Sequence, residues 1–220
     1  MYESFNDLTT INKQHMIEWF TGNALNTDRW ESYSNNGGTV AMDSSEDGGL
    51  YLQAATSDND YAGIGFGTTG SVGDDQAVRP FSNNSSKIIF VQKFSASSEY
   101  QASASGFDQK LRGDGLGAAE SGAILLTSTH NTSGKWVLRT GNGSSYSGYT
   151  YVTSSSMDTD WHVFTIECKS TSAEMKIDGV TEATSTTTLP SAEMGISFGI
   201  QSEGSATAKT NIHYCEAYNT

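Results

Sequence analysis

The sequence predicts an all-β chain in which two antiparallel sheets pack face to face as a sandwich. Residues 161–168 alternate strictly between two faces, as a β-strand does. Asp178-Gly179 lies between two further alternating segments and predicts a type I′ hairpin, because that turn needs positive φ at both central residues. Roughly a dozen short apolar segments recur between turn residues, at the spacing of a sandwich or barrel.

Composition supports one soluble, strand-rich domain. The 220 residues are 35% hydrophobic and 17% charged, with 23 glycines and 2 prolines. This is too apolar and too aromatic for a disordered chain, and the length suits one large all-β domain. The net charge of −13 repels phosphate backbones, so we expect no nucleic-acid partner.

The first 20 residues differ from the rest of the chain in the spacing of their apolar residues. Phe5, Leu8 and Ile11 recur at near-helical spacing, so residues 1–20 are predicted to form an N-terminal arm or a short helix. Residues 21–220 form the predicted sandwich domain. The N-terminus has neither the basic nor the apolar segment of a secretory signal, and no apolar stretch reaches the length of a membrane span.

The predicted strands follow one another with turn residues between them. The segment 62–67 alternates small and large residues, which indicates close approach of another backbone. The segment 76–81 contains Pro80 and is predicted at an edge, whereas 87–94 is predicted to be central. The remaining predicted strands are 30–33, 39–42, 50–54, 100–107, 123–128, 135–140, 149–153, 161–168, 174–177, 180–184, 194–201 and 211–218.

Cys168 and Cys215 each lie in an apolar strand pattern, which predicts buried free thiols. They could form a disulfide only if their strands are neighbours.

Several short motifs together resemble the concanavalin A-like lectin/glucanase jelly roll, including its laminin G-like members. They are Trp19-Phe-Thr-Gly22 followed by Trp30, then Gly48-Gly-Leu-Tyr-Leu52, Asp160-Trp-His162 and Ile177-Asp-Gly179. The resemblance covers roughly residues 19–219 and implies a two-sheet antiparallel jelly roll.

Glucanases of this superfamily carry Glu-x-Asp-x-Glu, or a variant one residue longer, on one strand. Because side chains alternate between the two faces of a strand, these carboxylates point into one cleft. No glutamate here has an aspartate two positions on, since Glu46-Asp47 are adjacent and Glu174 and Asp178 are four apart. The sequence therefore predicts no catalytic residues and a protein that is not an enzyme.

Acidic turns suggest a structural calcium site, because Ca²⁺ prefers carboxylate and carbonyl oxygens. Aspartate-rich turns also form without any metal, and the spacings match no specific calcium loop. The candidate ligands are Asp43, Glu46, Asp47, Asp58 and Asp60.

An aromatic segment rich in glycine and serine suggests a glycan site, since sugar rings stack on aromatic faces while polar groups bind their hydroxyls. The alternative is that Tyr149 and Tyr151 share one strand face and simply pack. The candidate glycan-binding residues are Tyr146, Tyr149, Tyr151, Asn142, Asp108 and Arg112.

The resemblance and the missing catalytic motif predict a non-catalytic virion surface protein, as in capsid decoration or tail-associated domains. Residues 1–20 would dock it to other virion proteins, and cell-surface glycans or further copies of the chain are possible partners. A carbohydrate-binding lectin module is the alternative, and a glycoside hydrolase is the third, disfavoured reading.

Overall fold

The computed structural model describes residues 14–43, 48–57, 60–67, 79–95, 101–108, 121–128, 134–147, 151–202 and 207–220. Within these residues there is no helix, so none could span a membrane. The strands are β1 (His15–Trp19), β2 (Trp30–Ser34), β3 (Thr39–Met42), β4 (Leu50–Gln53), β5 (Tyr61–Phe66), β6 (Ser85–Phe94), β7 (Gln101–Asp108), β8 (Ser121–Ser128), β9 (Lys135–Asn142), β10 (Tyr151–Ser156), β11 (His162–Lys169), β12 (Ala173–Ile177), β13 (Val180–Ser185), β14 (Gly195–Ser202) and β15 (Lys209–Asn219).

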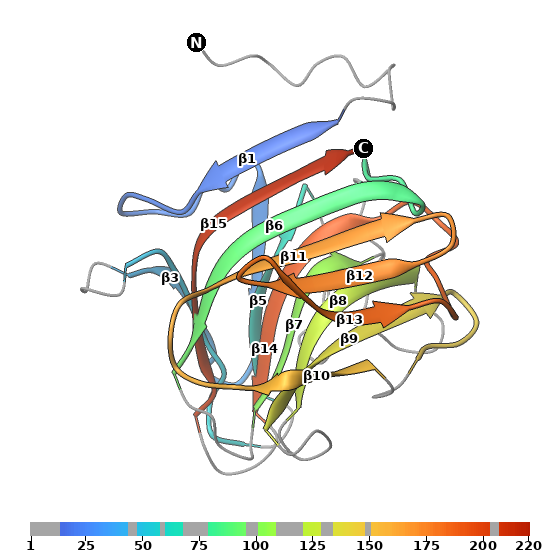
Figure 1. The fold of residues 1–220 in the computed structure, drawn as a ribbon. Helices are drawn as coiled ribbons and strands as arrows, with labels where there is room; N and C mark the ends of the chain where they lie inside the picture. Colours follow the sequence, from blue (N-terminus) through green and yellow to red (C-terminus); the bar gives the residue numbers. More distant parts are fainter. Residues whose placement is uncertain are drawn as a thin grey trace.

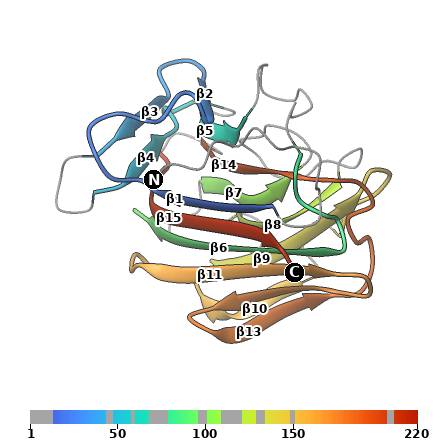
Figure 2. The same cartoon turned by 90° about the horizontal axis from the view of Figure 1, so that it is seen from above.

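The strands form two antiparallel sheets that lie one over the other (Figures 1 and 2). In the described part of the chain, one sheet has eight strands in the order β13-β12-β11-β6-β15-β4-β3, with β1 also paired to β15. The other has seven strands in the order β10-β9-β8-β7-β14-β5-β2. The chain therefore has the predicted concanavalin A-like jelly-roll fold.

The meander β11–β12–β13 forms as predicted. Phe164 and Ile166 on β11 pair with Ile177 and Met175 on β12, and all four side chains are buried. The turn that follows has φ of 50° at Asp178 and 83° at Gly179, which confirms positive φ at both central residues. On its other side β11 pairs with β6, the predicted central strand.

Aromatic rings from both sheets meet in the core. Phe198 on β14 lies 5.5 Å from Phe90 on β6, 6.2 Å from Trp30 on β2 and 6.4 Å from Phe20, measured between ring centroids. Phe198, Phe90 and Trp30 are at most 1% exposed. This cluster holds the sheets together, because burying large apolar side chains is the main favourable term in folding.

Residues 15–20 belong to the sandwich, so the helix alternative for the N-terminal segment fails where the structure describes it. β1 pairs along its whole length with β15, which satisfies its backbone in a ladder instead of a helix. Met16 and Phe20 are buried at 1% and 3% exposure. Residues 1–13 lie outside the described residues, so the separate arm remains a prediction for them.

Both cysteines are buried free thiols, as predicted. Cys168 lies on β11 and Cys215 on β15, and β6 runs between these strands. Burial raises the pKa of Cys168 to about 12 and raises that of Cys215 well above its ordinary value. Neither thiol is therefore a nucleophile at neutral pH.

Candidate functional site

A row of paired residues crosses the outer face of the seven-stranded sheet. Asp108 on β7 pairs with Gly122 on β8, Gly122 pairs with Gly141 on β9, and Gly141 pairs with Tyr146. Phe107 belongs to the core, so its neighbour Asp108 points to the outer face. Three strand spacings place Asp108 and Tyr146 roughly 14 Å apart, with only glycines between them. We call this set of four residues the glycine row.

Arg139 joins the glycine row from the adjacent position on β9. Its neighbour Leu138 packs in the core, so Arg139 also faces outward. The guanidinium carbon lies 4.0 Å from the centroid of the Tyr146 ring, a cation–π arrangement that orients the ring. Arg139 is 8% exposed, whereas Tyr146 is 41% exposed and presents aromatic surface to solvent.

The turn after β9 places Tyr146 in the row. Asn142 Oδ1 accepts hydrogen bonds from the backbone N–H groups of Ser144 (3.0 Å) and Ser145 (2.8 Å). Such side-chain acceptors are typical of aspartate and asparagine turns. The Ser147 N–H then donates to the Thr140 carbonyl at 2.8 Å, returning the chain alongside β9. Asn142 thus shapes the turn instead of facing a ligand with this oxygen.

The other predicted glycan residues separate from this row. Tyr151 pairs with Leu138 and packs against the core, and its hydroxyl lies 2.8 Å from Thr187 Oγ1. That hydrogen bond lowers the pKa of Tyr151 below its ordinary value. Tyr149 and Arg112 lie outside the described residues. Of the six candidates, the structure brings Asp108 and Tyr146 into one row.

Arg139 was missed by the sequence analysis. It stands in the strand segment Trp-Val-Leu-Arg-Thr, where the signal was a single charged residue on the face opposite Trp136 and Leu138. The reason for a cation at that position becomes visible only when the turn brings Tyr146 back against β9.

The two predicted calcium ligands that the structure describes, Asp43 and Asp60, each accept hydrogen bonds from protein groups. Asp60 is 1% exposed and accepts hydrogen bonds from the Asn36 amide (2.8 Å) and the Ser57 N–H (2.9 Å). Asp43 accepts from the Asn211 amide at 3.1 Å. Glu46, Asp47 and Asp58 lie outside the described residues, and within those residues no three His, Cys, Asp or Glu side chains could hold a metal together. The structural calcium remains a prediction.

His162 is held between two carboxylates. Its Nδ1 lies 2.6 Å from Asp178 Oδ2 and its Nε2 lies 2.9 Å from Asp158 Oδ1. Burial alone lowers the pKa of His162, but the hydrogen bonds to Asp178 and Asp158 outweigh it, so the pKa lies above the ordinary 6.5. Burial raises the pKa of each aspartate, yet hydrogen bonds from the backbone and from His162 leave both below 3.8. The cluster joins the β12–β13 turn to the segment before β11.

This cluster predicts a pH-dependent stability. Because the pKa of His162 is higher in the folded state, its contribution to the free energy of unfolding is full below about pH 6.5. That contribution is lost as pH rises through the folded pKa. Asp158 and Asp178 contribute to the free energy of unfolding above pH 3.8. Their contributions are lost as pH falls through their lower folded pKa values.

Chemical denaturation should therefore give a free energy of unfolding that falls as pH rises from about 6.5 through the folded pKa of His162. The same titration on His162→Gln, which cannot titrate, should show a flatter profile. Equal slopes for the two proteins would contradict the role of His162.

No protein-family model and no curated protein matches this sequence. Solved structures do match it. A Bacillus licheniformis β-glucanase has 13% identity and a TM-score of 0.65, covering 94% of this chain and 98% of its own. A GlcNAcα1-4Gal-releasing endo-β-galactosidase from Clostridium perfringens has 12% identity and a TM-score of 0.65, covering 98% of this chain and 64% of its own. The Emp47p carbohydrate recognition domain has 10% identity and a TM-score of 0.61, covering 99% of both chains.

These structures share the fold of this chain and correct two predictions. The expectations of a virion surface protein and of a chain that is not an enzyme are wrong, because the similar structures include carbohydrate-cleaving enzymes. The missing Glu-x-Asp-x-Glu pattern excludes one arrangement of carboxylates and not every carbohydrate activity.

Proposed function

We propose that this chain is a carbohydrate-active protein that binds a glycan at the glycine row and Arg139. The observation that carries the proposal is the Arg139–Tyr146 stack, which shares one sheet face with the Asp108 carboxylate. An aromatic ring, a guanidinium and a carboxylate are the groups that bind the apolar face and the hydroxyls of a sugar.

The two glycines of the row have no side chains. Gly122 and Gly141 carry no side chain between Asp108 and Tyr146, but both are buried in the free chain, so Tyr146 is the exposed member of the row. Arg139 fixes the Tyr146 ring before a ligand arrives, which reduces the conformational entropy lost on binding. The fold is consistent with this proposal, since similar structures are named as glycan-cleaving enzymes and a carbohydrate recognition domain.

Cleavage of the bound glycan is a second candidate, favoured by the position of Asp108. Asp108 lies on the same sheet face as Tyr146 and is fully buried in the free chain. Glycosidases use one carboxyl group as an acid and a second as a nucleophile or base. The glycine row supplies one such group, so hydrolysis needs a further carboxylate beside it.

Two assays on purified protein test the proposal. Affinity electrophoresis through barley β-glucan, laminarin and mucin measures binding, and release of reducing ends measures cleavage. We expect retardation by at least one polysaccharide and loss of any cleavage in Asp108→Asn, whereas the exposed Asp160→Asn behaves as wild type. Cleavage that survives in Asp108→Asn removes the catalytic role. Absence of both binding and cleavage contradicts the proposal.

A further inference from the structure

A second polar and aromatic surface lies on the outer face of the eight-stranded sheet. β1 and β15 place three cross-strand pairs there, because His15, Ile17 and Trp19 alternate with the inward-facing Met16. We call this surface the β1–β15 strip. Its pairs are His15 with Tyr218, Ile17 with Glu216, and Trp19 with Tyr214.

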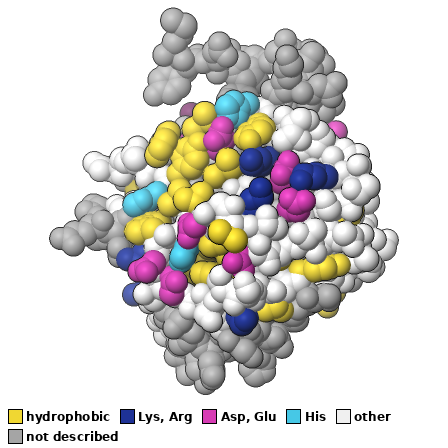
Figure 3. Space-filling view, viewed as in Figure 1, with side chains coloured by type: hydrophobic (Ala, Val, Ile, Leu, Met, Phe, Trp, Pro, Cys, Tyr) yellow, Lys and Arg dark blue, Asp and Glu magenta, His cyan; other side chains and the backbone are white. Residues whose placement is uncertain are grey.

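Figure 3 shows hydrophobic side chains gathered over β1 and β15, with histidine and acidic side chains among them. The strip runs for roughly 13 Å, since successive pairs are two residues apart along each strand. Its surface is accessible: Trp19 is 63% exposed and Ile17 is 44% exposed. Exposed aromatic surface of this extent is typical of a binding site.

The rings of the strip are held in place by their neighbours. The centroid of the Trp19 ring lies 4.4 Å from that of Tyr214, and the His15 ring meets Tyr218 edge-on at 5.7 Å. Rings fixed in this way lose little freedom when a ligand stacks on them. An exposed indole with an oriented face suits the apolar side of a sugar ring.

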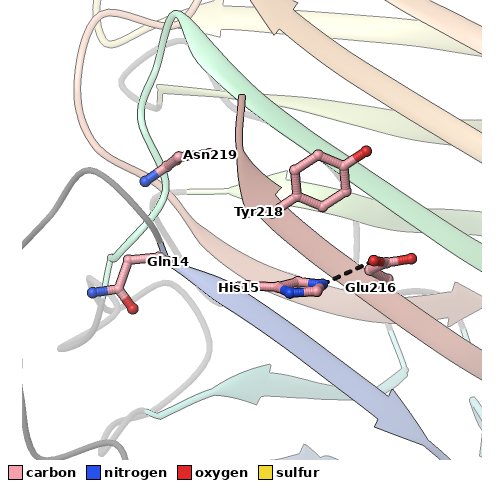
Figure 4. Close-up of a pocket in the computed structure, with 5 residues that line it drawn as sticks. All are labelled: Gln14, His15, Glu216, Tyr218 and Asn219. Atoms are coloured by element: carbon pink, nitrogen blue, oxygen red, sulfur yellow. Dashed lines mark hydrogen bonds and ion pairs between the residues drawn. The ribbon is translucent and has the colours of Figure 1, made fainter.

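Glu216 lies beside His15 (Figure 4), and the register places it between the two ring pairs of the strip. Its Oε1 accepts from His15 Nε2 at 2.8 Å, and its Oε2 accepts from the Tyr214 hydroxyl at 2.8 Å. The hydrogen bond from Tyr214 lowers the pKa of Glu216, so the group is a carboxylate at neutral pH. Each carboxylate oxygen has a further lone pair that a sugar hydroxyl can reach. Glu216, His15 and Tyr218 line a cavity of about 280 Å³.

The opposite end of the strip opens into a second cavity, of about 380 Å³. Trp19, Thr21, Asp43 and His213 contribute to its lining. His213 is fixed by stacking on Trp161, with ring centroids 3.9 Å apart. The carboxylate, imidazole and hydroxyl groups here give hydrogen-bonding partners beside the exposed indole.

We propose that the β1–β15 strip is a second glycan-binding site, which takes a linear oligosaccharide along the strands. Three features carry it: exposed rings at both ends, a carboxylate between them, and a cavity at each end. The carboxylate at the centre of the strip favours a sugar over a protein, because the core of a protein interface is depleted of charge. The site lies on a different sheet from the glycine row and does not depend on ligand binding there.

The four tryptophan indoles make the strip observable by NMR. Trp30 and Trp136 are each 1% exposed and serve as internal references, and Trp19→Phe assigns the Trp19 signal. Laminarihexaose, cellohexaose and chitohexaose are titrated separately into the Tyr146→Ala variant, which lacks the ring of the other site. We expect one hexasaccharide to shift the Trp19 signal saturably without moving the references. Trp19→Ala in the same background should weaken binding at least about fivefold.

Three results would overturn this proposal. The Trp19 signal could stay fixed with every hexasaccharide up to ~10 mM, which is the weak limit of useful affinity. It could move only in protein that retains Tyr146, which would assign binding to the glycine row alone. It could also change on dilution without any sugar, which would make the strip an interface between copies of this chain. The glycine-row proposal is unaffected by the first and third results.

Discussion

Replacing Phe198 with alanine should lower the free energy of unfolding by about 3–5 kcal/mol, the largest stability effect that we expect for a single substitution. Phe198 is fully buried on β14 and contacts the rings of Phe90, Trp30 and Phe20, which come from both sheets and from the segment after β1. Removing its ring leaves a cavity that the stiff surrounding strands fill only in part.

Urea denaturation followed by tryptophan fluorescence measures this effect. Val180→Ala is the matched control, because Val180 is 60% exposed at the β12–β13 turn and should change the free energy of unfolding by less than about 0.5 kcal/mol. A loss below about 1 kcal/mol for Phe198→Ala would show that the two sheets do not depend on this aromatic cluster.

Tyr146→Ala should weaken glycan binding about tenfold or more, the largest functional effect that we expect. Tyr146 supplies the exposed ring of the glycine row, and truncating a central aromatic contact typically removes more than about 1 kcal/mol of binding free energy. Its loss also removes the cation–π partner of Arg139 and leaves the guanidinium less well oriented.

Isothermal titration with the polysaccharide that gives the strongest retardation provides the dissociation constants. Tyr146→Phe keeps the ring and should stay within about threefold of wild type, since the stacking face is unchanged. Val152→Ala removes an exposed apolar side chain from neighbouring β10 and controls for nonspecific loss of surface. Equal affinities for wild type and Tyr146→Ala would exclude Tyr146 from the site.

The sequence predicted most of the fold because the strands carry local signals. Period-two alternation in residues 161–168 and the Asp178-Gly179 turn each depend on a few adjacent residues, and both were confirmed. The segment 15–19 is too short for its hydrophobic periodicity to distinguish a helix from a strand. Its conformation is decided by pairing with β15, some 200 residues away in the chain.

The candidate site could be predicted only in part. Tyr146 and Asp108 were named from residue type, but their common row depends on the register of β7, β8 and β9, which no local pattern specifies. Arg139 and the β1–β15 strip were missed for the same reason, since each arises where distant strands meet. The glycan-binding role of Tyr146 and Asp108 remains a prediction.

The most direct test of the central claim is a crystal structure of this chain with a bound oligosaccharide of the polysaccharide that retards it. The proposal predicts a sugar ring against the exposed face of Tyr146, with hydroxyls in contact with Arg139. A sugar bound only on the β1–β15 strip, with the glycine row unoccupied at saturating ligand, would contradict it.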